Sequence, residues 1–258
     1  MDMTECRSGS PRTAISFDER MTMKNPELSR RLMTAVSFVR GGFLADVGTD
    51  HAHLPVYLYL LGKIRGAVAS DVNEGPLARA RANIAAFGVG EGVATVLSDG
   101  LAKIEGYHPD DIVIFGMGGE LIVRIIDEAK WTKDERIRLI LQPMTKQEEV
   151  RSYLLENGFV IVDEALSEDD GKIYQTICAE YAPDALKKPY SRAELILGRQ
   201  NIERGGELFE RVLAHRIEVF SVACAGRRNS GRPDEALEAL VDQLTAISTK
   251  KENDDDRI

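Results

Sequence analysis

Two acidic side chains and a histidine lie close together near the start of the chain, around a single glycine. The apolar segment Phe43–Val47 predicts a buried strand that carries Asp46 and ends at Gly48, and a helical pattern follows. A strand, a glycine turn and a helix form the first unit of a nucleotide-binding α/β fold. Asp50 and His51 stand where a dinucleotide-binding loop carries further glycines. The loop therefore favours a ligand with positive charge over a phosphate-rich ligand.

Two more acidic residues follow predicted strands. The segment 66–71 predicts a second buried strand that ends in Asp71, where a carboxylate can accept both ribose hydroxyls of a nucleoside. A plain helix N-cap is the alternative for Asp71. Asp99 and Gly100 follow a third predicted strand over 92–97. That carboxylate could bind an adenine amino group, and a turn residue is its alternative.

A glycine-rich segment follows the fourth predicted strand, which covers 110–115. Three glycines in the four residues Gly116-Met117-Gly118-Gly119 indicate that the backbone comes close to another group. Ligands of an open parallel sheet bind at the edge where such strands end. The fifth predicted strand, 137–141, ends in Gln142, which could hydrogen-bond a base.

The segment after the fifth unit distinguishes between types of sheet. Residues 159–166 and 172–179 predict two strands, and residues 168–171 predict a tight turn between them. A turn this short permits only an antiparallel pair. Five βα units closed by a β-hairpin are typical of class I, Rossmann-like S-adenosylmethionine-dependent methyltransferases. A nicotinamide-binding sheet more often ends in another parallel unit. The acid-rich first loop agrees, since S-adenosylmethionine is a sulfonium cation without phosphate.

The chain divides into three predicted regions, a disordered lead-in over 1–24, the Rossmann-like domain over 25–183 and a C-terminal helical domain over 184–258. In the last region residues 192–204 predict one helix. Two apolar stripes at helical spacing then predict an antiparallel, coiled-coil-like hairpin. The stripes are Phe209, Val212, Leu213, Ile217 and Phe220, and Leu237, Leu240, Val241, Leu244 and Ile247.

Arginines in two places are candidate RNA contacts. Arg30 and Arg31 lie on a helix predicted over 25–40, and a solvated surface is their alternative role. Arg227, Arg228 and Arg232 lie in the predicted connector of the helical hairpin, where phosphate contact or a solvated turn are both open. Because the net charge is -9, RNA binding has to use such local patches rather than a general basic surface.

Composition also limits the cellular setting. The three cysteines form neither a metal-binding pattern nor an even set of disulfides, so we expect no metal and a reducing, cytoplasmic setting. No apolar run of about 18 residues is present, so we expect no membrane partner. A monomer or a weak dimer is the expected state, because a helical hairpin can self-associate.

Several motifs together resemble the bacterial TrmK family of tRNA adenine-N1 methyltransferases. They are Leu28-Ser-Arg-Arg-Leu32, Asp46-Val-Gly-Thr-Asp-His-Ala-His-Leu-Pro55, Glu74-Gly-Pro76, Gly116-Met-Gly-Gly119, Leu139-Ile-Leu-Gln-Pro143 and the hairpin residues Glu164 and Lys172-Ile-Tyr174. The resemblance implies S-adenosylmethionine as the methyl donor, adenine 22 of the tRNA D-arm as the target and a helical C-terminal domain that helps to hold tRNA. His53 stands where a tyrosine is familiar in this family.

Methyl transfer to adenine N1 defines what the catalytic residues must do. An in-line displacement requires alignment of the two reactants, and the base has to be unpaired or turned out of its stack. A carboxylate beside the base would stabilise the developing positive charge and could later accept a proton. Asp50 is the candidate, with a helix cap at Ala52 or His53 as its alternative role. His51 could orient Asp50 or contact the cofactor, or be purely structural.

The predicted site therefore has three groups of residues. The catalytic group is Asp50 and His51, and the cofactor group is Asp46, Gly48, Thr49, Asp71, Val72, Asp99, Gly100, Gly116, Met117 and Gly118. The substrate group is Gly119, Gln142, Pro143, Arg30, Arg31, Arg227, Arg228 and Arg232, with tRNA as the partner. Two other classes of function stay open, a non-catalytic RNA- or protein-binding module with a retained cofactor pocket and a nicotinamide-dependent oxidoreductase.

Overall fold

A seven-stranded sheet forms the centre of the protein in a computed structural model that describes residues 25–185 and 188–255. The predicted disordered lead-in over 1–24 lies outside the described residues. The strands, in chain order, are β1 (Phe43–Val47), β2 (Gly66–Asp71), β3 (Val93–Leu97), β4 (Asp111–Met117), β5 (Arg138–Pro143), β6 (Phe159–Asp169) and β7 (Lys172–Tyr181).

The order of the strands confirms the predicted type of sheet. Their spatial order is β3-β2-β1-β4-β5-β7-β6, with β1 to β5 parallel and β7 antiparallel to both of its neighbours. The hairpin turn is tighter than predicted and consists of Asp170 and Gly171, both at positive φ. An Asp-Gly pair favours the two-residue turn that joins antiparallel strands, so β6 extends from its predicted end to Asp169. At its other end β7 extends to Tyr181.

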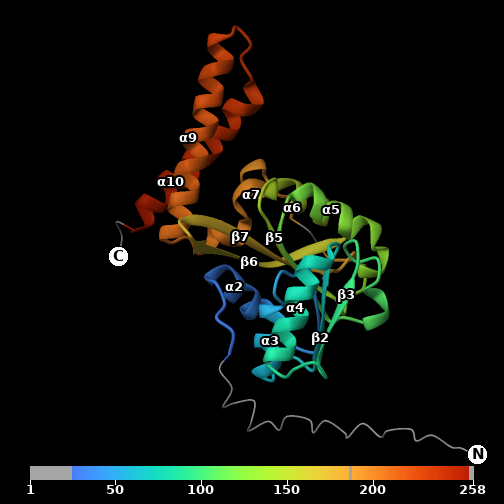
Figure 1. Cartoon of the computed structure of the whole chain (residues 1–258). Helices are drawn as coiled ribbons and strands as arrows, with labels where there is room; N and C mark the ends of the chain where they lie inside the picture. The colour runs from blue at the N-terminus through green and yellow to red at the C-terminus, as the bar shows by residue number, and fades with distance from the viewer. Residues whose placement is uncertain (1–24, 186–187, 256–258) are drawn as a thin grey trace, which may run out of the picture.

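Helices cover both faces of the sheet (Figure 1). One face carries α2 (Arg30–Phe38), α3 (His53–Leu60) and α4 (Glu74–Ala86), and the other carries α5 (Gly119–Glu128) and α6 (Gln147–Glu156). Two short 3-10 helices, η1 (Glu105–Tyr107) and η2 (Lys130–Thr132), lie in the connections. The central strands are buried on both faces, as the continuous apolar runs of β1, β2 and β4 require.

The C-terminal region contains four helices among its described residues, α7 (Arg192–Leu197), α8 (Arg199–Arg204), α9 (Glu207–Asn229) and α10 (Glu235–Asp255). The single helix predicted over 192–204 is wrong, because Gly198 breaks it with a φ of +86°. A Cβ at Gly198 would lie 2.5 Å from a carboxylate oxygen of Glu164. The break therefore lets the backbone pass close to a buried charge of β6.

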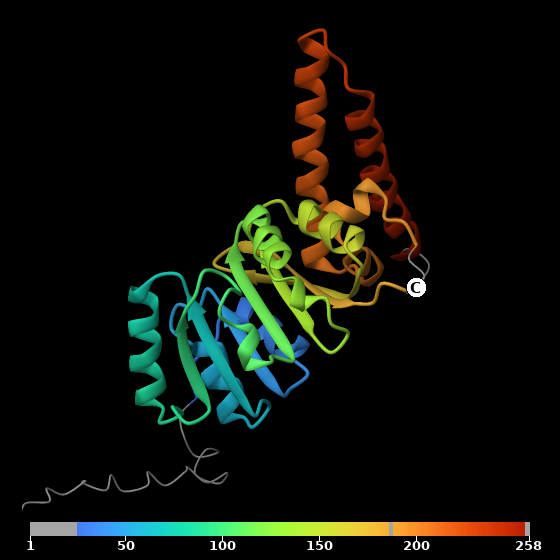
Figure 2. The same ribbon diagram turned by 90° about the vertical axis from the view of Figure 1, so that its right-hand side faces the viewer.

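Helices α9 and α10 form the predicted antiparallel hairpin, which stands away from the sheet (Figure 2). All the residues of both apolar stripes belong to one cluster with α7. The predicted connector is corrected, because Arg227 and Arg228 lie in the last turn of α9 and only Arg232 lies in the loop. None of the described helices is long and apolar enough to cross a membrane.

A buried ion pair joins the sheet to the helical region. Arg151 of α6 and Glu164 of β6 are both fully buried, with Nε and Oε1 2.7 Å apart. Arg151 also donates to the backbone oxygen of Leu195 (2.8 Å) and to the side chain of Gln175 (2.7 Å). Since removing one partner of a buried pair is costly, this contact fixes where α7 leaves the sheet.

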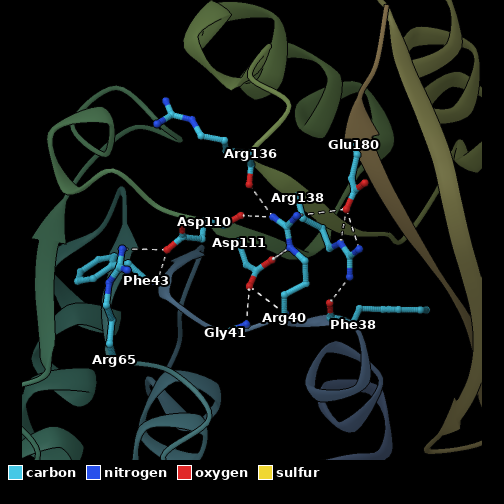
Figure 3. A network of polar contacts seen from close by, with 10 residues as sticks. All are labelled: Phe38, Arg40, Gly41, Phe43, Arg65, Asp110, Asp111, Arg136, Arg138 and Glu180. Atoms are coloured by element: carbon cyan, nitrogen blue, oxygen red, sulfur yellow. Dashed lines mark hydrogen bonds and ion pairs between the residues drawn. The ribbon is translucent and has the colours of Figure 1, made fainter. Parts of the chain in front are cut away.

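A second charged network closes the amino edge of the sheet, where the parallel strands begin (Figure 3). Arg40 pairs with the buried Asp111 (3.2 Å) and donates to the backbone oxygens of Asp110 (2.8 Å) and Arg136 (2.7 Å). The backbone amides of Arg40 and Gly41 both donate to Asp111 Oδ2. Every carboxylate oxygen of Asp111 is thus occupied by protein donors.

Candidate active site

A cavity of about 350 Å³ opens at the carboxyl edge of the sheet, at the end of β1. Its walls are residues 46–54 on one side, the α2 region with Glu27, Ser29, Arg31 and Leu32 on the other, and Phe115 of β4. This volume lies within the range of small-molecule sites, and its position is where ligands of open α/β sheets bind. We call it the edge cavity.

Gly48 shapes the floor of the edge cavity. It has a φ of +79°, and a Cβ there would lie 2.3 Å from Cε of Met117. Its backbone amide donates to the Ser70 oxygen of β2 (2.8 Å), which bends the chain across the end of the neighbouring strand. A side chain at this position would both strain the turn and collide with Met117 of β4, so Gly48 and Met117 are neighbours. Their shared role as cofactor residues stays a prediction.

Asp46 is the buried carboxylate of the edge cavity. Its exposed fraction is 8%, and burial raises the pKa of its carboxyl to about 6, against the lowering effect of a hydrogen bond with Thr49. Thr49 also accepts a hydrogen bond from the Ala52 amide (3.1 Å). A buried acid with so few donors is a group that a cationic ligand would stabilise in its charged form.

Asp50 lies at the rim rather than in the interior of the cavity. Arg79 of α4 donates from Nε to Asp50 Oδ1 (3.1 Å), and His51 Nε2 lies 3.4 Å from Oδ2. The hydrogen bond from Arg79 lowers the pKa of the Asp50 carboxyl. Asp50 is therefore ionised at neutral pH, and it is not the cap of α3, because that N-cap is Ala52 without a side-chain bond.

Two histidine rings face each other beside Asp50. The rings of His51 and His53 have centroids 5.2 Å apart, and burial lowers the pKa of His53. Asn83 of α4 donates to the backbone oxygen of His51 (2.8 Å) and holds the loop against α4. Ala52 in this loop has a φ of +52°, in the left-handed region of backbone conformation that residues other than glycine rarely adopt.

The carboxylates predicted on the second and third strands lie on the same edge but outside the walls of the edge cavity. Asp71 Oδ1 accepts a hydrogen bond from the Asn73 amide (2.7 Å). Val72 next to it is 58% exposed, which leaves an apolar surface beside an acid. Asp99 lies 3.4 Å from Arg124, and Gly100 packs against α5. Their arrangement suits a nucleoside that extends from β1 across β2 and β3.

The glycine-rich segment divides into two parts. Gly116 is exposed, at a bulge where the pairing of β4 with β5 shifts, and a Cβ there would lie 3.1 Å from Arg31 Nη1. Gly118 is the N-cap of α5. Gly119 is buried, and a Cβ would lie 2.5 Å from the backbone oxygen of Lys146. Packing against the β5–α6 loop thus accounts for Gly119, whose predicted substrate contact stays a prediction.

Gln142 is fully buried at the end of β5. Its side-chain oxygen accepts a hydrogen bond from Arg31 Nη1 (3.1 Å), and its amide nitrogen donates to the Pro143 oxygen (3.3 Å). Both ends of the amide are therefore engaged within the protein, and Pro143 is buried as well. Arg31, rather than Gln142, is the group that reaches the wall of the edge cavity.

The predicted RNA contacts are not brought together at this site. Arg30 is exposed and lies outside the cavity walls, whereas Arg31 is half-buried in them. Arg227 and Arg228 end α9, and Arg232 follows in the loop at the far end of the hairpin (Figure 2). Within the described part of the chain, Arg228 is the only one of these three with an ion-pair partner, Glu238 at 2.7 Å.

Sequence reasoning missed two residues near the site. Arg79 lies on α4, and Tyr174 of β7 lies under the Arg31 guanidinium, with 5.4 Å from its ring centroid to Arg31 Cζ. Tyr174 belongs to one of the motifs of the family resemblance, but neither that motif nor the position of Arg79 on a predicted helix indicates a contact 143 or 29 residues away in the chain. Only the packing of α4 and β7 around the sheet edge reveals them.

A larger cavity, of about 470 Å³, lies between α2, β6 and the start of α9. Two of the acidic side chains in its wall already have partners, since Asp163 pairs with Arg204 (2.7 Å) and Glu164 pairs with Arg151. It borders the junction between sheet and helices and contains none of the predicted catalytic or cofactor residues. The edge cavity is therefore the candidate active site.

Known proteins resemble this chain in sequence and in fold. Residues 28–177 match the model of a methyltransferase-domain family. The tRNA (adenine(22)-N(1))-methyltransferase of Bacillus subtilis (strain 168) is 36% identical over 159 residues, which are 61% of this chain and 67% of the relative. A Streptococcus pneumoniae protein solved in complex with S-adenosyl-L-methionine is 31% identical, with a TM-score of 0.76 over 86% of this chain and 99% of that one. The B. subtilis m1A22 tRNA methyltransferase TrmK is 29% identical, with a TM-score of 0.73 over 85% and 95%.

Proposed function

Because this chain belongs to the TrmK family of tRNA methyltransferases, we propose that it methylates N1 of an adenine in tRNA, at position 22, with S-adenosylmethionine as the donor. The observation that carries the proposal is the acid-rich loop after β1, which surrounds the edge cavity with Asp46 and Asp50 and no phosphate-binding glycine run. A loop of this chemistry suits a positively charged donor and a base that becomes positively charged.

The residues of the edge cavity fit S-adenosylmethionine. When bound, this cofactor supplies an electrophilic methyl group on a positively charged sulfur. Asp46 is a buried carboxylate whose charged form is stabilised by one side-chain hydrogen bond, from Thr49, and Gly48 leaves room for Met117 at the floor of the cavity. Asp71 with the exposed Val72, and then Asp99 on β3, offer acceptors and an apolar face along the edge for a ribose and an adenine. Of the remaining predicted cofactor residues, Thr49 lines the edge cavity. Cofactor contacts of Gly100, Gly116, Met117 and Gly118 stay predictions.

Asp50 stabilises charge rather than accepting a proton. Arg79 keeps the pKa of its carboxyl low, so Asp50 carries a negative charge at neutral pH and is a weak base. Methylation of adenine at N1 turns a neutral base into a cation. A fixed carboxylate at the rim, already oriented by Arg79, lowers the energy of that charge as it develops.

His51 acts on the same carboxylate from the other side. Its Nε2 lies 3.4 Å from Asp50 Oδ2, and its backbone oxygen is held by Asn83. His51 thus limits the directions in which Asp50 can point, and the adjacent ring of His53 gives the rim an aromatic surface. A base that is turned out of its stack can lie against such a surface.

The helical region holds the tRNA in this proposal. Residues 25–183 form the catalytic unit and residues 184–258 the helical unit, which has an apolar cluster of its own. Arg227, Arg228 and Arg232 contact phosphates at the tip of the hairpin, and Arg30 contributes from α2. The enzyme works in the cytoplasm, where tRNA is modified, and it needs neither a metal nor a membrane.

Nucleoside analysis of a defined tRNA tests the proposed function. The protein is incubated with S-adenosylmethionine and an unmodified transcript that has adenine at position 22, and with a matched transcript that has guanine there. We expect 1-methyladenosine from the first transcript only. Methylation of both transcripts would disprove position 22 as the target, and methylation of neither, with the cofactor bound, would favour a binding module.

A second assay tests the alternative that the protein is a nicotinamide-dependent oxidoreductase. That alternative required the β6–β7 pair to be parallel or absent, and the two strands pair antiparallel. We expect no change of NADH fluorescence on addition of the protein. A shift of that fluorescence, together with the absence of 1-methyladenosine, would overturn the proposed function.

A further inference from the structure

The loop between β5 and α6 is fixed against the end of β4 at the carboxyl edge of the sheet. The amide of Met144 donates to the Met117 oxygen (2.8 Å), and the Thr145 oxygen accepts a hydrogen bond from the Gly119 amide (3.0 Å). A Cβ at Gly119 would lie 2.5 Å from the Lys146 oxygen, so only glycine lets the two segments approach this closely. The second half of the glycine-rich segment therefore holds the β5–α6 loop in place.

Other elements hold the same loop in an uncommon conformation. Lys146 has a φ of +57°, in the left-handed region, and its ammonium group pairs with Glu120 of α5 and, at 3.0 Å, with Glu149 of α6. Gln147 accepts a hydrogen bond from Arg216 of α9 (3.3 Å). Backbone conformations of this kind persist where the surrounding structure fixes them, and they cluster at functional sites. The loop thus has a defined shape and connects the helical region to the catalytic edge.

Met144 is a large apolar side chain that this loop exposes. It is 41% exposed, and its sulfur accepts a hydrogen bond from the side-chain nitrogen of the buried Gln142 (3.6 Å). A single exposed apolar side chain is normal on a protein surface, so exposure alone assigns Met144 no role. Its place relative to the reaction does.

The order of the strands places Met144 on the side of the methyl acceptor. In the proposed function the cofactor extends from β1 across β2 and β3, where the apolar side chains of Val72 and Leu97 are exposed. The strands β4 and β5 lie on the other side of β1. Because in-line transfer requires the acceptor to face the methyl group, the adenine approaches over the side that the cofactor leaves free. Met144 lies there, at the end of β5.

We propose that the side chain of Met144 packs against the ring of the adenine that is methylated. This assignment rests on the proposed function and adds a substrate-contacting residue to it. A base that is turned out of its stack is held between aromatic or apolar side chains, and a thioether makes favourable contacts with an aromatic ring. A thioether cannot pair with a phosphate, so Met144 contacts the base rather than the RNA backbone. His51 and His53 form the rim on the β1 side, and Met144 forms the wall on the β5 side.

Steady-state kinetics on a transcript with adenine at position 22 test the assignment. We expect Met144→Ala to lower kcat/KM about 3- to 10-fold, and Met144→Leu, which keeps the apolar volume, to retain most of the activity. Met144→Lys places a cation beside a base that becomes positively charged, so kcat is expected to fall further although tRNA binds at least as tightly. Leu61→Ala is the matched control and is expected to behave as the wild type. Leu61 is 40% exposed and follows α3 at the amino edge.

A transcript with 2-aminopurine at position 22 reports the state of the base separately from the chemistry. The fluorescence of 2-aminopurine increases when the base leaves its stack, and we expect a smaller increase with Met144→Ala than with the wild type. Affinity for tRNA by filter binding and affinity for S-adenosylmethionine by calorimetry are expected to be unchanged in Met144→Ala. A melting curve checks that each variant is folded.

Wild-type kinetics and wild-type fluorescence in Met144→Ala would overturn the assignment. A loss of cofactor affinity as large as the loss of activity, or full activity of Met144→Lys, would also overturn it. A wild-type protein that binds the cofactor and forms no 1-methyladenosine would instead contradict the proposed function itself.

Discussion

The two edges of the sheet hold buried carboxylates of opposite character. At the amino edge Asp111 receives two backbone amides and the guanidinium of Arg40 (Figure 3). At the carboxyl edge Asp46 has only a hydrogen bond with Thr49 to oppose its burial. Burial raises the pKa of both carboxyls, but only Asp111 has protein donors on both oxygens.

The difference indicates that Asp111 stabilises the fold, whereas Asp46 is available to a ligand. A buried charge that the protein pairs completely joins segments that are distant in sequence, as Asp111 joins β4 to the start of β1. A buried charge that stays incompletely paired costs stability and is explained by a ligand that completes it. Asp46 is such a group, in the edge cavity.

Replacement of Asp111 gives the largest expected effect on stability. Asp111→Ala leaves Arg40 and two amides without their acceptor, and we expect a loss of about 3 kcal/mol in the free energy of unfolding. Urea denaturation measures it, and calorimetry with S-adenosylmethionine is expected to give wild-type affinity for the folded variant. A stable variant that has lost cofactor binding would break the comparison between the edges.

Replacement of Asp46 should show the reverse behaviour. Asp46→Asn removes the counter-ion of a cationic ligand, and we expect S-adenosylmethionine to bind about 30-fold more weakly, which corresponds to about 2 kcal/mol. Because the buried charge is also removed, the melting temperature without cofactor is expected to be unchanged or higher at pH 7. A lower melting temperature with intact binding would show that Asp46 is structural.

The pH dependence sharpens the same contrast. Burial raises the pKa of Asp46 to about 6 in the folded protein, from an ordinary value of 3.8 for an aspartate in water. The contribution of Asp46 to the stability of the protein without cofactor is therefore fully present below about pH 4 and is lost as the pH rises through 6. Cofactor affinity should change in the other direction, with an increase of about tenfold between pH 5 and 7. In Asp46→Asn, both the stability and the cofactor affinity should depend less on pH. Melting curves and calorimetry at several pH values measure the two profiles. Profiles that are the same in the variant and the wild type would contradict this role of Asp46.

The smallest effect concerns the tip of the helical hairpin. Arg227 and Arg232 have no carboxylate partner among the described residues, whereas Arg228 pairs with Glu238. By the same reasoning, the double change of Arg227 and Arg232 to Ala should raise the KM for tRNA several-fold and lower the salt slope of binding by about two. Arg228→Ala is the control with a smaller expected effect. If Arg228→Ala weakens tRNA binding as much as the double change does, the contrast between paired and unpaired charges holds only for buried groups.

Local patterns predicted the frame of the fold well. β1 and β2 have the predicted bounds, because a short apolar run next to a glycine favours a buried strand. The antiparallel hairpin was predictable from the short Asp-Gly turn. The break at Gly198 was not predictable, because its cause is the carboxylate of Glu164 from a distant strand.

The site was predictable in its position but not in its electrostatics. Asp46, Gly48 and Asp50 follow from a strand that ends in a glycine turn. The ionised state of Asp50 depends on Arg79 of α4, and the engagement of Gln142 depends on Arg31 of α2. Such contacts form between elements that only the folded sheet brings together, so no spacing in the sequence indicates them.

One measurement tests most directly that the carboxyl edge carries the reaction. Labelled S-adenosylmethionine and tRNA are incubated with the wild type, Asp50→Ala and Asp110→Ala, where Asp110 pairs with Arg65 at the amino edge. The account predicts 1-methyladenosine from the wild type and Asp110→Ala, and a loss of about 100-fold or more in Asp50→Ala although the cofactor still binds. Wild-type turnover by Asp50→Ala, or an equal loss in Asp110→Ala, would contradict it.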